Sequence, residues 1–413
     1  MMRRAYKFRL RPTAKQHAAL QACLDVHRRL YNDALAERRD AWEQVKALPA
    51  FATMEQARSP VTFTSQSADL PARRAADERL ARFGSGSEQA TLRRLDRAFQ
   101  AFFRRVRNGE VPGYPRFKAA DRFDSVTWPS PGDACRWIPE TSRVYLQGVG
   151  QAKVSAHRSV EGKLKTISVK REGRRWFLVL SCEEVPERPL EPTGEVVGID
   201  VGIAHFLATS DGELVENPRH GRVAAERLEA AQRRLQHKRR GSKNRAKVRE
   251  TVARRHRKIA DQRRDFHHQL ARRLVAERDV LCIEDLVVKN MVRRPAPAPA
   301  PDRPGEFLPN GVAAKAGLNR SISDAGWAQF TSILRAKAEE AGRIVVGVNP
   351  RHTSQTCNAC GHVDARNRVS QAEFRCLACG HTANADVNAA KNILGAGLAL
   401  LAGQVSQKEA VGL

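Results

Sequence analysis

Three acidic residues, Asp200, Glu284 and Asp386, have the positions expected of ligands for divalent cations. Asp200 and Glu284 each follow a short apolar run, and Asp386 opens a segment with helical periodicity. Burying an ionised carboxylate costs free energy unless a positive charge lies beside it. Carboxylates are preferred ligands of Mg²⁺, and two such ions about 3.5–4 Å apart can activate a water and stabilise the leaving oxygen of a phosphodiester. The three acids therefore predict a site for phosphodiester hydrolysis, provided that they converge in space.

Each acid also has a simpler structural interpretation. Asp200 could form a turn, and Glu284 could be a strand-end charge shared with Asp285. Asp386 could be the N-cap of the helix that follows it, since aspartate is a favoured N-cap residue. Sequence position alone leaves these alternatives open.

Four cysteines form a second candidate site, of a different kind. They make two Cys-x-x-Cys pairs separated by fifteen residues, Cys357 with Cys360 and Cys376 with Cys379. This spacing is typical of a zinc ribbon. Four thiolates complete the tetrahedral shell of Zn²⁺, so we expect a structural ion with no open position for chemistry.

The dipeptide Gly-His follows each Cys-x-x-Cys pair. The two segments, which we call hooks, therefore look like copies of one knuckle. Glycine permits the tight turn that aims backbone amides at the thiolates. His362 and His381 remain alternative ligands, and two disulfides remain an alternative to the metal. We favour zinc because the chain shows neither a signal peptide nor an apolar run of about 18 residues, which predicts a reducing cytoplasm. The remaining cysteines are expected to be small buried residues: Cys23, Cys135, Cys182 and Cys282.

The charge of the chain indicates its partner. Among 413 residues, 72 are Lys or Arg and 45 are Asp or Glu, which gives a formal net charge of +27. Such an excess repels itself unless a polyanion neutralises it, so nucleic acid is the expected partner rather than a small-molecule substrate or a membrane. A hydrophobic content of 41% excludes a disordered chain, and the length predicts two or three domains.

Basic residues concentrate between Arg219 and Arg264, where eighteen Lys or Arg residues face four acidic ones. Apolar residues recur there at helical spacing, so one face packs and the others are cationic. A charged stretch is usually a solvated face, but this imbalance favours contact with phosphates, which position a duplex without reading its sequence. The expected nucleic-acid contacts are Arg233, Arg234, Lys238, Arg239, Arg240, Lys243, Arg245, Lys247, Arg254 and Arg255.

The elements that must position these sites differ between the two halves of the chain. Alternating residues predict short strands at 5–11 and between about 113 and 184, with helical sequence between them. A proline-rich linker at 186–192 follows. Beyond it, buried strands at 196–199, 280–283 and 344–348 alternate with helices at 219–278 and 323–341, which predicts a mixed α/β sheet.

The order of these motifs resembles the TnpB family, transposon-encoded RNA-guided DNA nucleases related to the type V CRISPR effectors. The resemblance rests on the segments at 198–202 and 283–286 and on the cysteine knuckles that run into 386–394. It extends to 6–10 and 114–118 near the N-terminus and covers most of the chain.

The resemblance implies a multi-domain α/β plus β-barrel fold. It implies a RuvC/ribonuclease-H-like nuclease domain with an inserted four-cysteine zinc ribbon, and an N-terminal β-barrel wedge domain with a helical recognition insertion. The expected boundaries are the wedge at 1–11 and 112–190, the recognition helices at 12–111, the nuclease at 191–350 and 383–413 with the C-terminal tail, and the ribbon at 351–382.

The resemblance also implies an activity. Asp200, Glu284 and Asp386 would be catalytic ligands of Mg²⁺ or Mn²⁺, and the enzyme would cut double-stranded DNA selected by a guide RNA. Family members often have a basic residue just before the last acid, where this chain has Ala385. Two other classes remain open: a cleavage-inactive, guide-dependent regulator, and a structure-selective resolvase that works without a guide.

Overall fold

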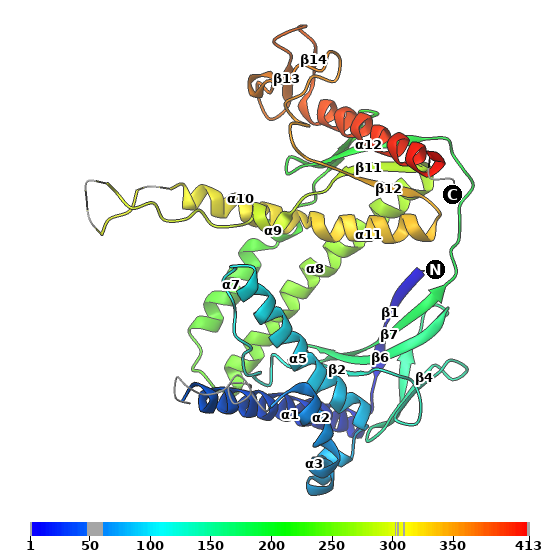
Figure 1. Ribbon diagram of the computed structural model, residues 1–413, viewed down its shortest axis with the longest axis vertical. Helices are drawn as coiled ribbons and strands as arrows, with labels where there is room; N and C mark the ends of the chain where they lie inside the picture. Colours follow the sequence, from blue (N-terminus) through cyan, green and yellow to red (C-terminus); the bar gives the residue numbers. More distant parts are fainter. Residues whose placement is uncertain (1, 48–60, 302, 304, 309, 411–413) are drawn as a thin grey trace. The chain divides into compact units, whose positions relative to one another are not determined.

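The computed structural model describes residues 2–47, 61–301, 303, 305–308 and 310–410, with side chains to residue 403. Contacts divide the chain into two compact units, Met1–Pro186 and Glu187–Leu413 (Figure 1). Each unit has its own hydrophobic core, so each is described by itself.

The N-terminal unit contains a seven-stranded antiparallel sheet with the order β2-β6-β7-β1-β5-β4-β3. Strand β3 at one edge contacts β6 near the other, so the sheet curls into a nearly closed barrel. Tyr6, Phe8 and Leu10 of β1 alternate into the core, as the sequence predicted. The strands are β1 (Met2–Arg11), β2 (Ser125–Trp128), β3 (Cys135–Ile138), β4 (Arg143–Leu146), β5 (Gly150–Ser155), β6 (Lys163–Glu172) and β7 (Arg175–Val185).

Helices occupy the chain between β1 and β2. A capping box begins the first of them, because Thr13 and Gln16 each accept the other's backbone amide through their side chains. Leucines such as Leu24 and Leu95 pack the long helices into the same core as the barrel. The helices are α1 (Ala14–Lys46), α2 (Phe63–Ala68), α3 (Leu70–Ala76), α4 (Glu78–Ala81) and α5 (Ser85–Arg107).

The C-terminal unit is built on a mixed five-stranded sheet with the order β10-β9-β8-β11-β12. Strands β8, β11 and β12 run parallel, whereas β9 and β10 are antiparallel additions at one edge. The predicted buried strands at 196–199, 280–283 and 344–348 all form. The strands are β8 (Val196–Val201), β9 (His205–Thr209), β10 (Leu214–Glu216), β11 (Val280–Glu284) and β12 (Ile344–Val348).

Helices cover both faces of this sheet. On one face, Ile199 and Ile283 pack with residues of α8 (Lys243–Glu277) and α11 (Trp327–Glu340). On the other face lies α12 (Ala385–Ala410), which crosses β8, β11 and β12 (Figure 1). A Cβ atom at Gly198 would lie 2.0 Å from the carbonyl oxygen of Ala390, so glycine in β8 is required for α12 to approach. No helix of the described chain is long and apolar enough to cross a membrane.

Shorter elements complete the C-terminal unit. The helical region predicted at 219–278 is broken at 237–242, where Gly241 has a φ of +82°. The remaining elements are α6 (His220–Val223), α7 (Ala225–Gln236), α9 (Val288–Met291), α10 (Val312–Ala325), the 3₁₀ helix η1 (Ala365–Asn367), β13 (Glu373–Arg375) and β14 (Thr382–Asn384).

Candidate functional site

Strand register brings Asp200 and Glu284 together. Ile199 of β8 pairs with Ile283 of β11 in a parallel ladder, so the next residue of each strand is an acid at the same edge of the sheet. Successive side chains of a strand point to opposite faces. Because the isoleucines face α8 and α11, both acids face α12.

Asp386 reaches this site from the first turn of α12. The Asn384 side chain accepts the amides of Asp386 and Val387 at 3.0 and 3.1 Å, so Asn384 takes the capping role considered for Asp386. A Cβ atom at Gly202, just past β8, would lie 3.9 Å from Asp386 Oδ2. Ala385, which precedes this acid, is fully buried at 0% exposure.

The electrostatics show that the three acids interact. Burial raises the pKa of Asp200 well above its ordinary value, and the charges of Glu284 and Asp386 raise it further. Burial likewise raises the pKa of Glu284. Asp200 therefore lies within the electrostatic field of both other acids. A divalent cation would reverse these shifts, because it is attracted to the ionised form of each acid.

Sequence reasoning missed two side chains that touch these acids. Thr353 Oγ1 donates a hydrogen bond of 2.5 Å to Glu284 Oε1, which opposes the rise in the Glu284 pKa. Arg368 Nη2 donates to Asp386 Oδ1 at 2.8 Å. Both residues lie in loops around the cysteine knuckles, and nothing in their local sequence indicates a contact with an acid elsewhere in the chain.

The oxygen donors fit Mg²⁺ or Mn²⁺, which prefer carboxylate and water ligands. Within the described part of the chain, the four cysteines are the only set of three or more His, Cys, Asp or Glu side chains grouped closely enough to hold a metal ion, so the three acids do not form such a set in this structure. The repulsion that raises the pKa of Asp200 and the Arg368–Asp386 ion pair both act against a closer approach of the acids.

The cysteine cluster has the geometry of a tetrahedral site. Sγ of Cys357 lies 3.8 Å from Sγ of Cys379, and Sγ of Cys360 lies 3.6 Å from Sγ of Cys376. A zinc tetrahedron with Zn–S bonds of about 2.3 Å has S–S edges of about 3.8 Å. Hydrogen bonds from the backbone amides of Cys379 and Ala378 lower the pKa of Cys376 to about 6. The donor set and its spacing therefore fit Zn²⁺.

The two hooks share one backbone geometry, as their sequences predicted. Gly361 and Gly380 have φ values of +77° and +72°, a region that side chains other than glycine rarely adopt. Each glycine donates its amide to the carbonyl of the first cysteine of its pair, at 2.9 and 3.0 Å. His362 and His381, considered as alternative ligands, are not part of the metal-binding set.

Two asparagines join the knuckle to the helix that carries Asp386. Asn388 donates to the Thr356 carbonyl at 2.8 Å and accepts the Asn358 amide at 3.1 Å. Asn392, one turn later, donates to the carbonyls of Thr353 and Thr356 at 2.9 and 2.7 Å. The knuckle therefore fixes the start of α12, and with it the position of Asp386. The sequence signal for this contact is the pair of amide side chains, Asn388 and Asn392, four residues apart in an otherwise apolar helix.

The predicted nucleic-acid contacts lie on α7, on α8 and in the turn between them. Arg245 is engaged internally, because Nη1 donates to the carbonyls of Leu235 and Lys238, both at 2.7 Å. Arg245 and Arg255 are half-buried, and the other eight predicted residues are exposed. The positive surface predicted from composition therefore exists, and one of its members fixes the turn.

Three family models match the chain. A helix-turn-helix domain matches residues 1–47, which contain β1 and α1. A probable transposase matches residues 179–294, and a Cas12f1-like TNB domain matches residues 327–393. The second and third matches together span the acidic site and the cysteine knuckles.

Curated relatives match over nearly the whole length. A putative RNA-guided DNA endonuclease InsQ of Escherichia coli (strain K12) is 33% identical, over 96% of this chain and 93% of its own. A putative RNA-guided DNA endonuclease of Streptomyces pristinaespiralis is 34% identical, over 96% and 90%. Among solved structures, a Cas12f1-sgRNA-target DNA complex is similar with a TM-score of 0.50 and 17% identity, over 91% of this chain and 81% of that one, which indicates a related fold.

Proposed function

This chain belongs to the TnpB family of RNA-guided DNA endonucleases, and from that premise we propose that Asp200, Glu284 and Asp386 are its DNA-cutting residues. One observation carries the proposal: the charges of Glu284 and Asp386 raise the pKa of Asp200, although the three are distant in sequence. The sheet of β8 to β12 with α12 across one face would be the RuvC/ribonuclease-H-like nuclease domain.

The chain acts with a guide RNA on target double-stranded DNA. In guided nucleases, base pairing reads the sequence and the protein holds the heteroduplex by its backbone. The ten predicted nucleic-acid contacts on α7, on α8 and in the turn between them would contribute to that hold, which should make binding strongly salt-dependent through counterion release. The barrel and helices of the N-terminal unit would be the wedge and recognition domains.

Each residue of the acidic site would have a definite role in cleavage. Asp200, Glu284 and Asp386 would hold two Mg²⁺ or Mn²⁺ ions, which supply an activated water and neutralise the developing charge. Thr353 would keep the Glu284 carboxylate oriented through its hydrogen bond. Arg368 donates to the Asp386 carboxylate in this structure. When the acids bind cations, Arg368 would leave that carboxylate and contact a DNA phosphate instead.

The cysteine knuckle would hold a structural Zn²⁺ through Cys357, Cys360, Cys376 and Cys379. Its contribution to cleavage would be indirect, because the asparagines of α12 bind the knuckle backbone and so position Asp386.

The proposal is tested with protein purified together with its own RNA. The RNA is sequenced, and a DNA duplex matching its variable segment is incubated with the complex and Mg²⁺. We expect cleavage of the matched duplex, none of a scrambled duplex, and none after chelation of Mg²⁺. Bound RNA without cleavage in Mg²⁺ or Mn²⁺ would support the regulator alternative, and cleavage of branched DNA without RNA would support the resolvase.

A further inference from the structure

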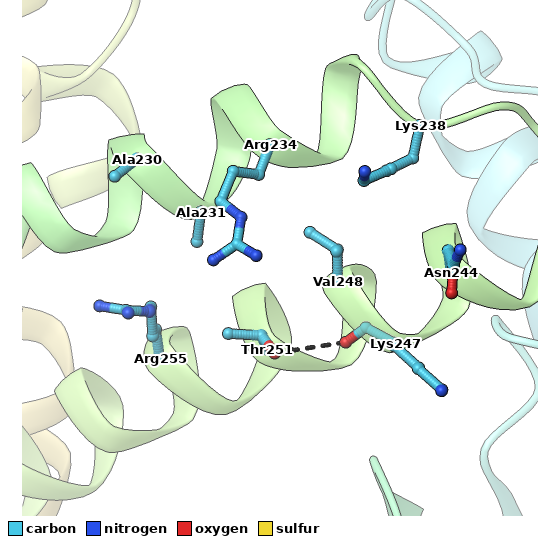
Figure 2. Close-up of a pocket in the computed structure, with 9 residues that line it drawn as sticks. All are labelled: Ala230, Ala231, Arg234, Lys238, Asn244, Lys247, Val248, Thr251 and Arg255. Atoms are coloured by element: carbon cyan, nitrogen blue, oxygen red, sulfur yellow. Dashed lines mark hydrogen bonds between the residues drawn. The ribbon is translucent and has the colours of Figure 1, made fainter.

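Helices α7 and α8 line a cavity of about 380 Å³ within the C-terminal unit (Figure 2). Small side chains line it, with buried Ala231 and exposed Ala230 on α7 and half-buried Val248 and Thr251 on α8. Residues three positions apart share one face of a helix, so Ala231 and Arg234 project from one side of α7 and Val248 and Thr251 from one side of α8, and the short side chains leave a gap between the helices. Arg234 extends from α7 toward α8 across this gap (Figure 2).

Four cations surround the apolar wall: Arg234, Lys238, Lys247 and Arg255. No carboxylate is among the described residues that line the cavity. None of the four side chains forms an ion pair or hydrogen bond with another described side chain. Since like charges at this proximity repel one another, the cavity is suited to an anion with more than one charge.

The combination of an apolar wall and cations narrows the class of ligand. The volume lies at the lower end of small-molecule pockets, which span about 300–1,000 Å³, and exceeds what a single phosphate group occupies. A nucleotide fits both features, with its base against the alanines and its flanking phosphates at the cations. A paired base is stacked between its neighbours, so the nucleotide must be unstacked to enter.

We infer that this cavity receives one unstacked nucleotide of the bound nucleic acid. The inference rests on the proposed function, since the guide RNA and the target DNA are the strands that can supply it. It goes beyond a cationic surface for phosphates, because it assigns a base contact to Ala230, Ala231 and Val248. Asn244, at the mouth of the cavity, has an amide available to hydrogen-bond the edge of that base.

The test is ultraviolet crosslinking of the complete complex of protein, co-purified RNA and matched DNA. Short-wave light joins bases, not phosphates, to adjacent side chains, so a surface that holds only the backbone gives no adduct. After nuclease and trypsin digestion, we expect a nucleotide adduct on the peptides 228–233 or 250–254, which carry cavity residues. The mass of the remaining sugar identifies RNA or DNA as the source, and either supports the inference.

Matched variants separate the cavity from the surface around it. Ala230→Leu fills the cavity without changing charge, and we expect the adduct to fall about tenfold, the size of a lost base contact. Ala253→Leu makes the same change at an exposed site of α8 and should leave the adduct unchanged. Arg234→Gln should lower the slope of log affinity against log salt by about 0.7–0.9, as for one lost phosphate contact. Arg227→Gln, an exposed residue of α7 outside the cavity, should not lower it.

Guided cleavage measured on the same samples distinguishes the two proposals. A complex that cuts matched DNA but gives no adduct on either peptide would overturn the nucleotide pocket and leave the proposed function intact. An adduct that persists in Ala230→Leu would also overturn the pocket. A complex that binds RNA and gives the adduct, yet never cuts, would overturn the proposed function instead.

Discussion

The cysteine knuckle and the acidic site are two candidate metal sites of contrasting construction. The knuckle takes all its ligands from two short hooks, and their sulfurs lie within 4.8 Å of one another. The acidic site takes one carboxylate from each of β8, β11 and α12, and within the described chain these three do not form a compact ligand set. An arginine, Arg368, holds one of them.

The contrast shows what each site demands of the fold. A short hook with two turn-forming glycines can assemble half of a zinc site locally. Carboxylates repel one another, so the acidic site depends on the sheet, on α12 and on the cations that we propose it binds. Asn388 and Asn392 of α12 connect the two sites, so the knuckle supports the position of Asp386 in the acidic site.

The largest expected effect is at Asp200, because the acidic site has no spare ligand. Asp200→Ala should lower guided cleavage about a thousandfold or more, while RNA binding is retained, since the change removes one of the three proposed ligands of the cations. Asp261→Ala, which removes an exposed carboxylate on α8, is the control and should cut normally. Cleavage by Asp200→Ala at the normal rate would refute the site.

Replacing a single cysteine should disrupt the whole knuckle. Cys357→Ser should abolish stoichiometric zinc, measured by metal analysis, and lower the melting temperature, because a structural zinc site contributes roughly 10 kcal/mol of apparent folding free energy in small domains. Cleavage should fall about a hundredfold as the start of α12 loses its support. Cys182→Ser, at a lone buried cysteine of the barrel, should retain zinc. Unchanged zinc in Cys357→Ser would contradict the ribbon.

Thr353 connects the two regions, because it lies just before the first hook and hydrogen-bonds Glu284. Thr353→Val should lower the cleavage rate about tenfold, the cost of a lost hydrogen bond to a charged group, and Thr353→Ser should restore it. Thr356→Val is the matched control, because the Thr356 hydroxyl donates to the His352 carbonyl and not to an acid. Equal losses in the Ser and Val variants would indicate a packing role instead.

Lowering the pH should weaken cation binding at the acidic site before it weakens zinc binding at the knuckle. The raised pKa of Asp200 means that protons compete with the cation there, so the Mg²⁺ concentration for half-maximal cleavage should rise as pH falls, by up to about tenfold per pH unit for one displaced proton. Zinc should stay bound over the same range, because four thiolates hold it in a closed tetrahedral shell. Parallel cleavage and zinc assays between pH 8 and about 6.5 test this. Loss of zinc at a higher pH than the rise in the Mg²⁺ requirement would contradict this prediction.

The smallest effect is expected at Arg368. Arg368→Gln removes a competitor for the Asp386 carboxylate, so half-maximal cleavage should need about two- to fivefold less Mg²⁺, the size of a partly exposed ion pair. The maximal rate should fall, because the proposed phosphate contact is lost. Arg366→Gln, which breaks the neighbouring ion pair with Asp364, should change neither quantity. A higher Mg²⁺ requirement in Arg368→Gln would show that the arginine assists the site rather than competing with it.

Sequence patterns were sufficient for features that depend on local chemistry. The apolar runs predicted β8 and β11, and the spacing of the cysteines predicted which four thiols meet. Alternation in residues 6–10 predicted β1. These features succeed because the periodicity of a strand, or the turn of a hook, is set by residues close together in the chain.

The remaining features depend on tertiary contacts. Asp386 was a possible N-cap, yet Asn384 caps α12 and leaves the acid in the site. Thr353 and Arg368 gained their roles from contacts with acids in other segments. Helical periodicity likewise did not reveal the turn at 237–242, which separates α7 from α8 and contains Gly241 with a positive φ.

The most direct measurement is titration of the zinc-loaded protein with Mn²⁺, followed by electron paramagnetic resonance of the free ion. The account predicts two Mn²⁺ ions bound per chain, with that stoichiometry lost in Asp200→Ala and kept in Asp261→Ala. Identical Mn²⁺ binding in the two variants would show that Asp200, Glu284 and Asp386 do not hold the cations, and the account of DNA cutting given above would be wrong.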